Sequence, residues 1–188
     1  MKRLVVLISG RGRNLQALIE ATRSGALPAE IALVVSNRAD AQGLGLAEAA
    51  GIATHVLPHT AYPNREAFDA ELLRIVVAAK PDLVALAGFM RILTPVFISA
   101  FEGRLLNIHP SLLPRHRGLN THARALAAGD TEHGATVHFV TQQLDEGPPI
   151  LQGRIPIHPD DTAETLAERV LEEVELKIYP QAIAGLLQ

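Results

Sequence analysis

A carboxamide and an imidazole lie two residues apart in the stretch Asn107-Ile108-His109-Pro110-Ser111-Leu112-Leu113-Pro114. The apolar residues before this stretch predict a short buried strand, and alternation along an extended segment places Asn107 and His109 on one side of the backbone. The two prolines restrict the loop that follows. A rigidly held hydrogen-bond donor beside a titratable ring suits stabilisation of a tetrahedral oxyanion and transfer of a proton.

A glycine-rich turn, Ser9-Gly10-Arg11-Gly12-Arg13-Asn14, follows the first predicted strand and opens a helix. Backbone N–H groups and the helix dipole at such a start favour phosphate binding, and Arg11 and Arg13 add positive charge. The dinucleotide-binding fingerprint needs a third glycine where Leu15 stands, so that version of the motif is absent. An ordinary tight turn is the alternative interpretation.

The segment Gly88-Phe89-Met90-Arg91-Ile92-Leu93 follows another predicted strand. Its apolar side chains and single arginine suit a flat heteroaromatic ligand that carries a carboxylate. Taken alone, the residue types favour plain core with a surface arginine.

A third turn, Leu144-Asp145-Glu146-Gly147-Pro148, follows a strand that contains His138. A carboxylate fixed in this turn could orient and charge an imidazole. An aspartate selected for its turn chemistry is the simpler interpretation of the turn alone.

Histidines are dense in the second half of the chain, at His109, His116, His122, His133 and His138. This density raises the alternative of a zinc site. We expect no metal, because the chain has neither a His-Glu-x-x-His motif nor a short histidine pair on one predicted helix.

Strand and helix patterns alternate along most of the chain. The expected strands are Leu4–Ile8, Ile31–Val35, Thr54–Leu57, Leu83–Leu86, Leu105–Ile108, Ala135–Val140 and Ile150–Ile157, and the expected helices are Asn14–Arg23, Ala41–Ala50, Arg65–Ala79, His122–Ala128 and Thr162–Ile178. This order predicts an α/β fold with a mostly parallel central sheet flanked by helices. Sites in such sheets collect outside the carboxyl ends of the strands, so the loops beginning at Ser9, Gly88, Asn107 and Thr141 are expected at one shared edge.

Composition limits the classes of protein that fit. With 188 residues, 48% of them hydrophobic, the chain predicts one globular domain over 1–188. The net charge of −3 gives no bulk attraction to nucleic acid or an acidic membrane. The absence of cysteine excludes disulfides and a thiol nucleophile. The apolar run near Met1 is too short for a signal core or a membrane span, so we expect a cytoplasmic protein.

Together these motifs resemble the folate-dependent formyltransferase family. Asn107, His109 and Asp145 carry the resemblance, which runs from Leu4 to about Pro180. Three further motifs narrow it to the branch that formylates glycinamide ribonucleotide: Ser-Gly-x-Gly-x-Asn-Leu at the start, Ala-Gly-Phe-Met-Arg-Ile-Leu at 87–93, and Thr121-His122 followed by Arg124-Ala125-Leu126.

The resemblance implies a Rossmann-like formyltransferase fold and a reaction of de novo purine biosynthesis. A formyl group would pass from the co-substrate 10-formyltetrahydrofolate to the amine of glycinamide ribonucleotide, without a metal. The ribonucleotide part would cover about 1–100, and the folate and catalytic part about 86–188. The implied partners are these two small molecules, and the chain would act as a monomer or homodimer.

The resemblance also assigns roles to individual residues. The catalytic residues would be Asn107, His109 and Asp145. The ribonucleotide would be held by the backbone N–H groups of Gly12, Arg13 and Asn14 at its phosphate, and by Glu175 at its ribose. The folate would contact Arg65, Met90, Arg91, Ile92, Leu93, Asn107, Val140 and Asp145, with the 141–145 loop around the pterin.

Two features depart from this family pattern. Asn120 stands where many bacterial members have histidine, and the chain ends at Gln188, soon after the closing helix. Relatives often continue in a tail that is peripheral to the site.

Three rival functions explain less of the sequence. A methionyl-tRNA formyltransferase is expected to carry an RNA-binding domain, and a formyltetrahydrofolate hydrolase an added regulatory domain. A non-catalytic nucleotide-binding module explains the glycine-rich turn but gives Asn107, His109 and Asp145 no purpose.

Overall fold

Seven strands form one sheet in the computed structural model, which describes residues 1–188. The strands, in the spatial order β3-β2-β1-β4-β5-β6-β7, are β1 (Lys2–Ile8), β2 (Ala29–Ser36), β3 (Thr54–Val56), β4 (Leu83–Leu86), β5 (Leu105–His109), β6 (Glu132–Phe139) and β7 (Pro149–Pro156). The strands β1 to β5 pair in parallel, and β6 and β7 extend the sheet in antiparallel pairs. The predicted α/β fold with a mostly parallel sheet is confirmed.

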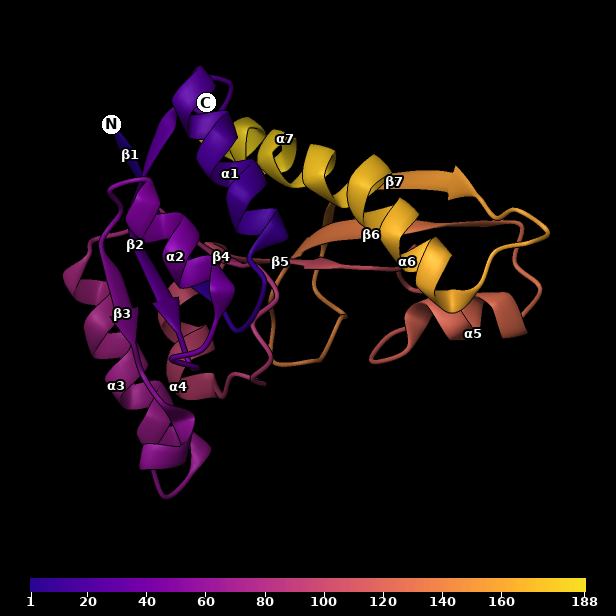
Figure 1. Cartoon of the computed structure of the whole chain (residues 1–188). Helices are drawn as coiled ribbons and strands as arrows, with labels where there is room; N and C mark the ends of the chain where they lie inside the picture. The colour runs from indigo at the N-terminus through magenta and orange to yellow at the C-terminus, as the bar shows by residue number, and fades with distance from the viewer.

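Helices cover both faces of this sheet (Figure 1). One face packs against α1 (Arg13–Ser24), α2 (Gln42–Ala49) and the C-terminal helix, and the other against α3 (Arg65–Ala78) and α4 (Pro95–Ile98). Strand β1 serves both cores, because Leu4, Val6 and Ile8 point to the first face and Val5 and Leu7 to the second. None of the helices combines the length and apolar character that a membrane span needs.

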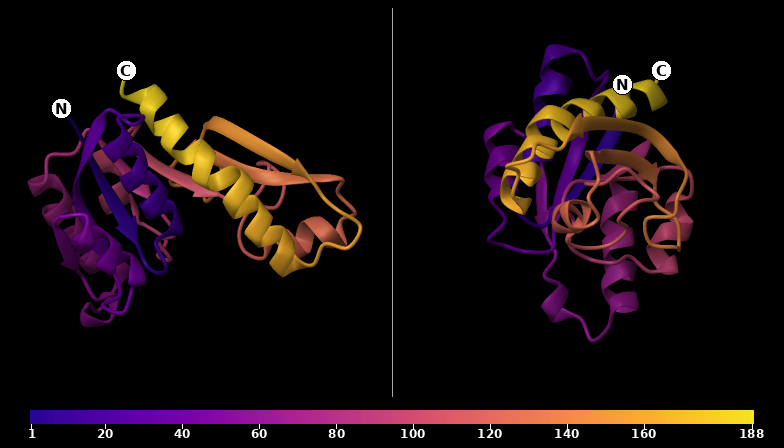
Figure 2. Two further views of the ribbon diagram at one scale, coloured as in Figure 1. Left: turned by 45° about the horizontal axis from the view of Figure 1, so that its top comes forward. Right: turned by 90° about the vertical axis from the view of Figure 1, so that its right-hand side faces the viewer.

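The C-terminal helix is one long rod that crosses the sheet (Figure 2). It consists of α6 (Ala163–Val170), a π-helical turn (Leu171–Glu175) and α7 (Leu176–Leu186). The predicted end at Ile178 is wrong, since the helix continues past Pro180. Pro180 lies inside α7, after the π-helical segment, and removes one N–H donor from the helix. Buried Tyr179 and Ile183 hold the continuation against the sheet.

The antiparallel strand β6 changes where its following loop begins. The Val140 N–H donates to the Leu105 carbonyl oxygen (2.8 Å), so the 140–148 loop starts at the opposite end of β5 from His109. The expectation of one shared edge therefore applies only to the loops after parallel strands. The loop nevertheless reaches His109 through Asp145, because it folds back along the sheet.

Three residues other than glycine adopt the left-handed backbone conformation near His109. They are His116, Asn120 and Asp145, with φ of 53°, 57° and 55°. Asn120 precedes α5 (Thr121–Ala127), and asparagine tolerates this conformation better than most residues. The backbone at this helix start therefore gives a physical reason for asparagine at position 120.

Candidate active site

A buried imidazole–carboxylate pair lies at the centre of the site. His109 ends β5, and its Nδ1 atom lies 3.6 Å from Oδ2 of Asp145. The two residues are only 6% and 8% exposed. The other ring nitrogen of His109, Nε2, lies 2.9 Å from the His116 carbonyl oxygen. Because both ring nitrogens face oxygen acceptors, the geometry suits an imidazolium that donates in both directions.

Backbone contacts fix the loop that contains Asp145. The Gly118 N–H donates to Oδ2 of Asp145 over 2.9 Å, which orients the carboxylate toward His109. Gly147 leaves no room for a side chain, since a Cβ there would lie 1.6 Å from the Phe139 carbonyl oxygen. Asp145 itself adopts the left-handed conformation, a strain that persists at functional positions when the surrounding structure imposes it. The interpretation of Asp145 as a mere turn residue does not explain this burial and pairing.

Asn107 supplies an unoccupied donor beside the pair. It lies two residues before His109 on β5, next to Leu86 of β4 and opposite His138 of β6. Its side chain is half-buried and makes no hydrogen bond within the chain. A carboxamide held in this way has an N–H group free for an oxygen of a ligand.

His138 is a second imidazole whose environment the sequence did not reveal. It is 2% exposed, and its Nδ1 lies 3.0 Å from the Phe139 carbonyl oxygen, so Nδ1 is the donor. Burial lowers the pKa of His138, which keeps the ring neutral. Its Nε2 is then an acceptor, buried without a hydrogen-bond partner and 4.0 Å from Oδ1 of Asp145. The neutral His138 contrasts with His109, whose ring nitrogens both face acceptors.

The glycine-rich turn forms the start of α1, as predicted. Gly12 precedes the helix in the left-handed conformation, with φ of 78°. A Cβ on Gly12 would lie 2.7 Å from Cα of Gly43, so only glycine fits between this turn and α2. The first N–H groups of α1 have no carbonyl partner within the helix and can receive an anion.

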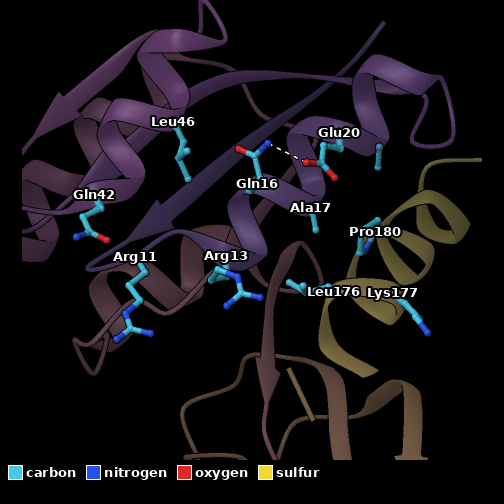
Figure 3. A pocket seen from close by; sticks show the side chains of 11 residues that line it. Arg11, Arg13, Gln16, Ala17, Glu20, Gln42, Leu46, Leu176, Lys177 and Pro180 are labelled. Atoms are coloured by element: carbon cyan, nitrogen blue, oxygen red, sulfur yellow. Dashed lines mark hydrogen bonds between the residues drawn. The ribbon is translucent and has the colours of Figure 1, made fainter. Parts of the chain in front are cut away.

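The arginines of this turn face a surface hollow of about 760 Å³ between α1, α2 and α7 (Figure 3). Arg11, Gln42 and Lys177 contribute polar groups to its lining. The Arg13 guanidinium forms ion pairs with Glu168 (3.2 Å) and Glu172 (3.5 Å). None of the predicted catalytic residues lines the hollow, so it is separate from the buried imidazole–carboxylate pair.

The C-terminal helix brings Glu175 to the glycine-rich turn. Glu175 ends the π-helical segment, and its Oε1 accepts a hydrogen bond from Nδ2 of Asn14 over 3.2 Å. Burial raises the pKa of Glu175, and the Asn14 hydrogen bond partly opposes this shift. The other amide atom of Asn14, Oδ1, is buried without a partner. The structure places Glu175 beside Asn14, although 161 positions separate them.

The 88–94 loop after β4 presents an apolar surface rather than core. Met90 and Ile92 are 71% and 55% exposed, whereas Leu93 is buried. The interpretation of this segment as core is wrong for Met90 and Ile92. Arg91 lies 5.5 Å from the ring centre of Phe68 on α3, the helix that begins with Arg65. Half-buried Val140 belongs to the loop after β6.

Ser9 connects the glycine-rich turn with the 88–94 loop. Its hydroxyl accepts the Met90 N–H (2.8 Å) and donates to Oδ1 of Asn37 (2.5 Å). Sequence reasoning missed this contact, because a serine before a glycine-rich turn gives no sign of a partner 81 positions away.

Three more of the clustered histidines have close polar partners. Nδ1 of His122 lies 3.0 Å from Nε2 of His133, and Nε2 of His116 lies 2.6 Å from Oδ2 of Asp130. No three histidine, aspartate or glutamate side chains come together in a geometry that could hold a metal ion.

The fold and this site define a member of one enzyme class. Residues 2–183 match the formyl transferase family, and the chain belongs to that family.

Among named relatives, the chain is 52% identical over 181 residues to phosphoribosylglycinamide formyltransferase of Escherichia coli (strain K12), covering 96% of this chain and 85% of the relative. Among solved structures, it is similar to glycinamide ribonucleotide transformylase 1 from Symbiobacterium toebii, with a TM-score of 0.95 and 49% identity over 98% of this chain and 86% of the other. It is also similar to phosphoribosylglycinamide formyltransferase from Coxiella burnetii, with a TM-score of 0.92 and 53% identity over 97% and 85% of the two chains.

Proposed function

We propose that this chain transfers the formyl group of 10-formyltetrahydrofolate to the amine of glycinamide ribonucleotide. The products are formylglycinamide ribonucleotide and tetrahydrofolate, and the reaction is a step of de novo purine biosynthesis. The observation that carries this proposal is the buried His109–Asp145 pair, 3.6 Å apart, in a family of formyl-transferring enzymes.

The ribonucleotide binds at the start of α1. Its phosphate accepts hydrogen bonds from the N–H groups of Gly12, Arg13 and Asn14, aided by the helix dipole. Its ribose hydroxyls contact Glu175, whose carboxylate is already oriented by Asn14. The unpartnered Oδ1 of Asn14 supports this assignment, because a buried acceptor without a donor favours a ligand hydroxyl.

The formyl donor binds between the 88–94 loop and the 140–148 loop. Met90, Ile92, Leu93 and Val140 offer apolar contact to its flat pterin ring, with Asn107 and Asp145 at the reacting end. Arg65 and Arg91 supply positive charge for the glutamate carboxylates of the folate. Arg65 is exposed and forms no ion pair within the chain, which leaves it available.

The reaction follows from these positions. The amine nitrogen attacks the formyl carbon, and the carbonyl oxygen becomes an oxyanion. Asn107 donates a hydrogen bond to it, which is typically worth about 3–4 kcal/mol in the transition state. The His109 ring, when protonated, stabilises the negative charge of the oxyanion from the same face of β5. Asp145 keeps the His109 ring oriented. The bond to the folate nitrogen then breaks, that nitrogen gains a proton, and the new amide nitrogen loses one.

An assay of formyl transfer tests the proposal. Purified protein is supplied with 10-formyltetrahydrofolate and either glycinamide ribonucleotide, methionyl-tRNA or no acceptor. We expect tetrahydrofolate to be released only with glycinamide ribonucleotide. Release at the same rate without any acceptor would identify a hydrolase and overturn the proposal.

A further inference from the structure

A side chain of α3 anchors the last residue of the 88–94 loop by hydrogen bonds. Oδ2 of Asp69 accepts two hydrogen bonds from Thr94, one from its N–H (2.6 Å) and one from its Oγ hydroxyl (2.8 Å). Asp69 and Thr94 are 1% and 8% exposed. The loop has no regular secondary structure of its own, so contacts of this kind determine its shape.

The carboxylate of Asp69 is unusual for its position. It is almost fully buried, and no lysine, arginine or histidine lies within salt-bridge distance of it. Burial raises the pKa of Asp69, and the two hydrogen bonds from Thr94 and the nearby Arg91 partly oppose this shift. Burial of a carboxylate costs free energy unless hydrogen bonds compensate for the lost water. Both compensating hydrogen bonds of Asp69 come from one residue of the loop, Thr94.

Arg91 connects this anchor with the exposed part of the loop. Its guanidinium lies over the ring of Phe68, the residue before Asp69, at 5.5 Å. Its Nε atom is buried without a hydrogen-bond partner, and the contact with the Phe68 ring holds the side chain against α3. At the other side of the loop, the hydroxyl of Ser9 accepts the Met90 N–H. The exposed side chains of Met90 and Ile92 therefore lie in a loop that is anchored by Ser9 at one side and by Asp69 at the other.

We propose that Asp69 is a positioning residue for the formyl donor: it fixes Thr94 and thereby sets the shape of the folate-binding loop. This inference rests on the proposed function, since it assigns the 88–94 loop to the folate. A purely structural role would lower the stability of the protein without a selective effect on one substrate.

The test compares Asp69→Ala and Asp69→Asn with Glu71→Gln, which removes a partly exposed carboxylate from the same helix. Binding of a non-reactive folate analogue and of glycinamide ribonucleotide is measured by calorimetry, alongside KM for each substrate and the midpoint of urea unfolding. We expect Asp69→Ala to weaken folate binding and raise its KM about tenfold or more, with the ribonucleotide values within about twofold. Asp69→Asn keeps an acceptor oxygen, so it should recover part of the loss, and Glu71→Gln should bind the folate analogue as the wild type does.

Two further variants keep the test decisive if Asp69→Ala does not fold. Thr94→Ser retains both hydrogen bonds and should bind folate normally, whereas Thr94→Val loses the hydroxyl and should bind it more weakly. Unchanged folate binding in folded Asp69→Ala or Thr94→Val, or equal loss for both substrates, would overturn the inference. Failure of the wild type to bind the folate analogue would instead overturn the proposed function.

Discussion

Acid is expected to destabilise the fold through one buried histidine on β6. His133 is 1% exposed, and its Nε2 lies 3.0 Å from Nδ1 of His122. Burial, followed by the charges of His122 and His116, lowers the pKa of His133 from 6.5 to about 4. A histidine with a lowered pKa binds fewer protons in the folded than in the unfolded protein. Its contribution to stability is therefore complete above pH 6.5 and is lost as the pH falls toward 4.

The size of this effect follows from the shift. Each pH unit inside this window lowers the free energy of unfolding by at most about 1.4 kcal/mol, which gives a loss of about 2 kcal/mol at about pH 5 relative to neutral solution. Burial also lowers the pKa of His122 and His138, so the loss in the wild-type protein should be at least this large.

The assay is urea unfolding of the wild type, His133→Gln and His158→Gln at about pH 7.5 and about pH 5. His158 is exposed, so its variant controls for the loss of a histidine. We expect His133→Gln to lose about 2 kcal/mol less than the other two proteins between the two pH values. The same loss in all three proteins would show that His133 does not become protonated in this window.

Two further predictions concern the substrate sites. Gly12→Val should weaken binding of glycinamide ribonucleotide while leaving folate binding nearly intact, because a side chain there collides with Gly43; calorimetry on both ligands would contradict this if both affinities fell equally or neither fell. Residues 141–147 should be protected from hydrogen exchange when a folate analogue binds, because this loop carries Asp145 to His109. Unchanged exchange on binding of the analogue would contradict the assignment of this loop to the folate.

Local patterns in the sequence predicted most of the architecture. Apolar runs such as Leu83–Leu86 identified the buried parallel strands, and the glycine-rich turn identified the start of α1. The alternation of Asn107 and His109 along β5 also placed both residues at the site. These features depend on neighbours in the chain, so periodicity and turn chemistry reveal them.

Contacts between distant segments could not be predicted in the same way. The antiparallel direction of β6 moved the start of the 140–148 loop, and the buried carboxylate of Asp69 looked like any polar residue of a helix. The C-terminal helix continues beyond Pro180, although proline usually ends a helix, because its later residues pack against the sheet. The assignment of Asn14 and Glu175 to one ligand came from the family resemblance, because no local pattern joins residues so far apart.

The most direct test of the account is formyl transfer by His109→Ala and Asp145→Asn, measured in single turnovers together with the affinity for both substrates. The account predicts that each variant folds, binds glycinamide ribonucleotide and folate nearly as well as the wild type, and transfers the formyl group at least about 10²-fold more slowly. Transfer at a near-normal rate by either folded variant would contradict the assignment of the buried His109–Asp145 pair as the chemical centre of this protein.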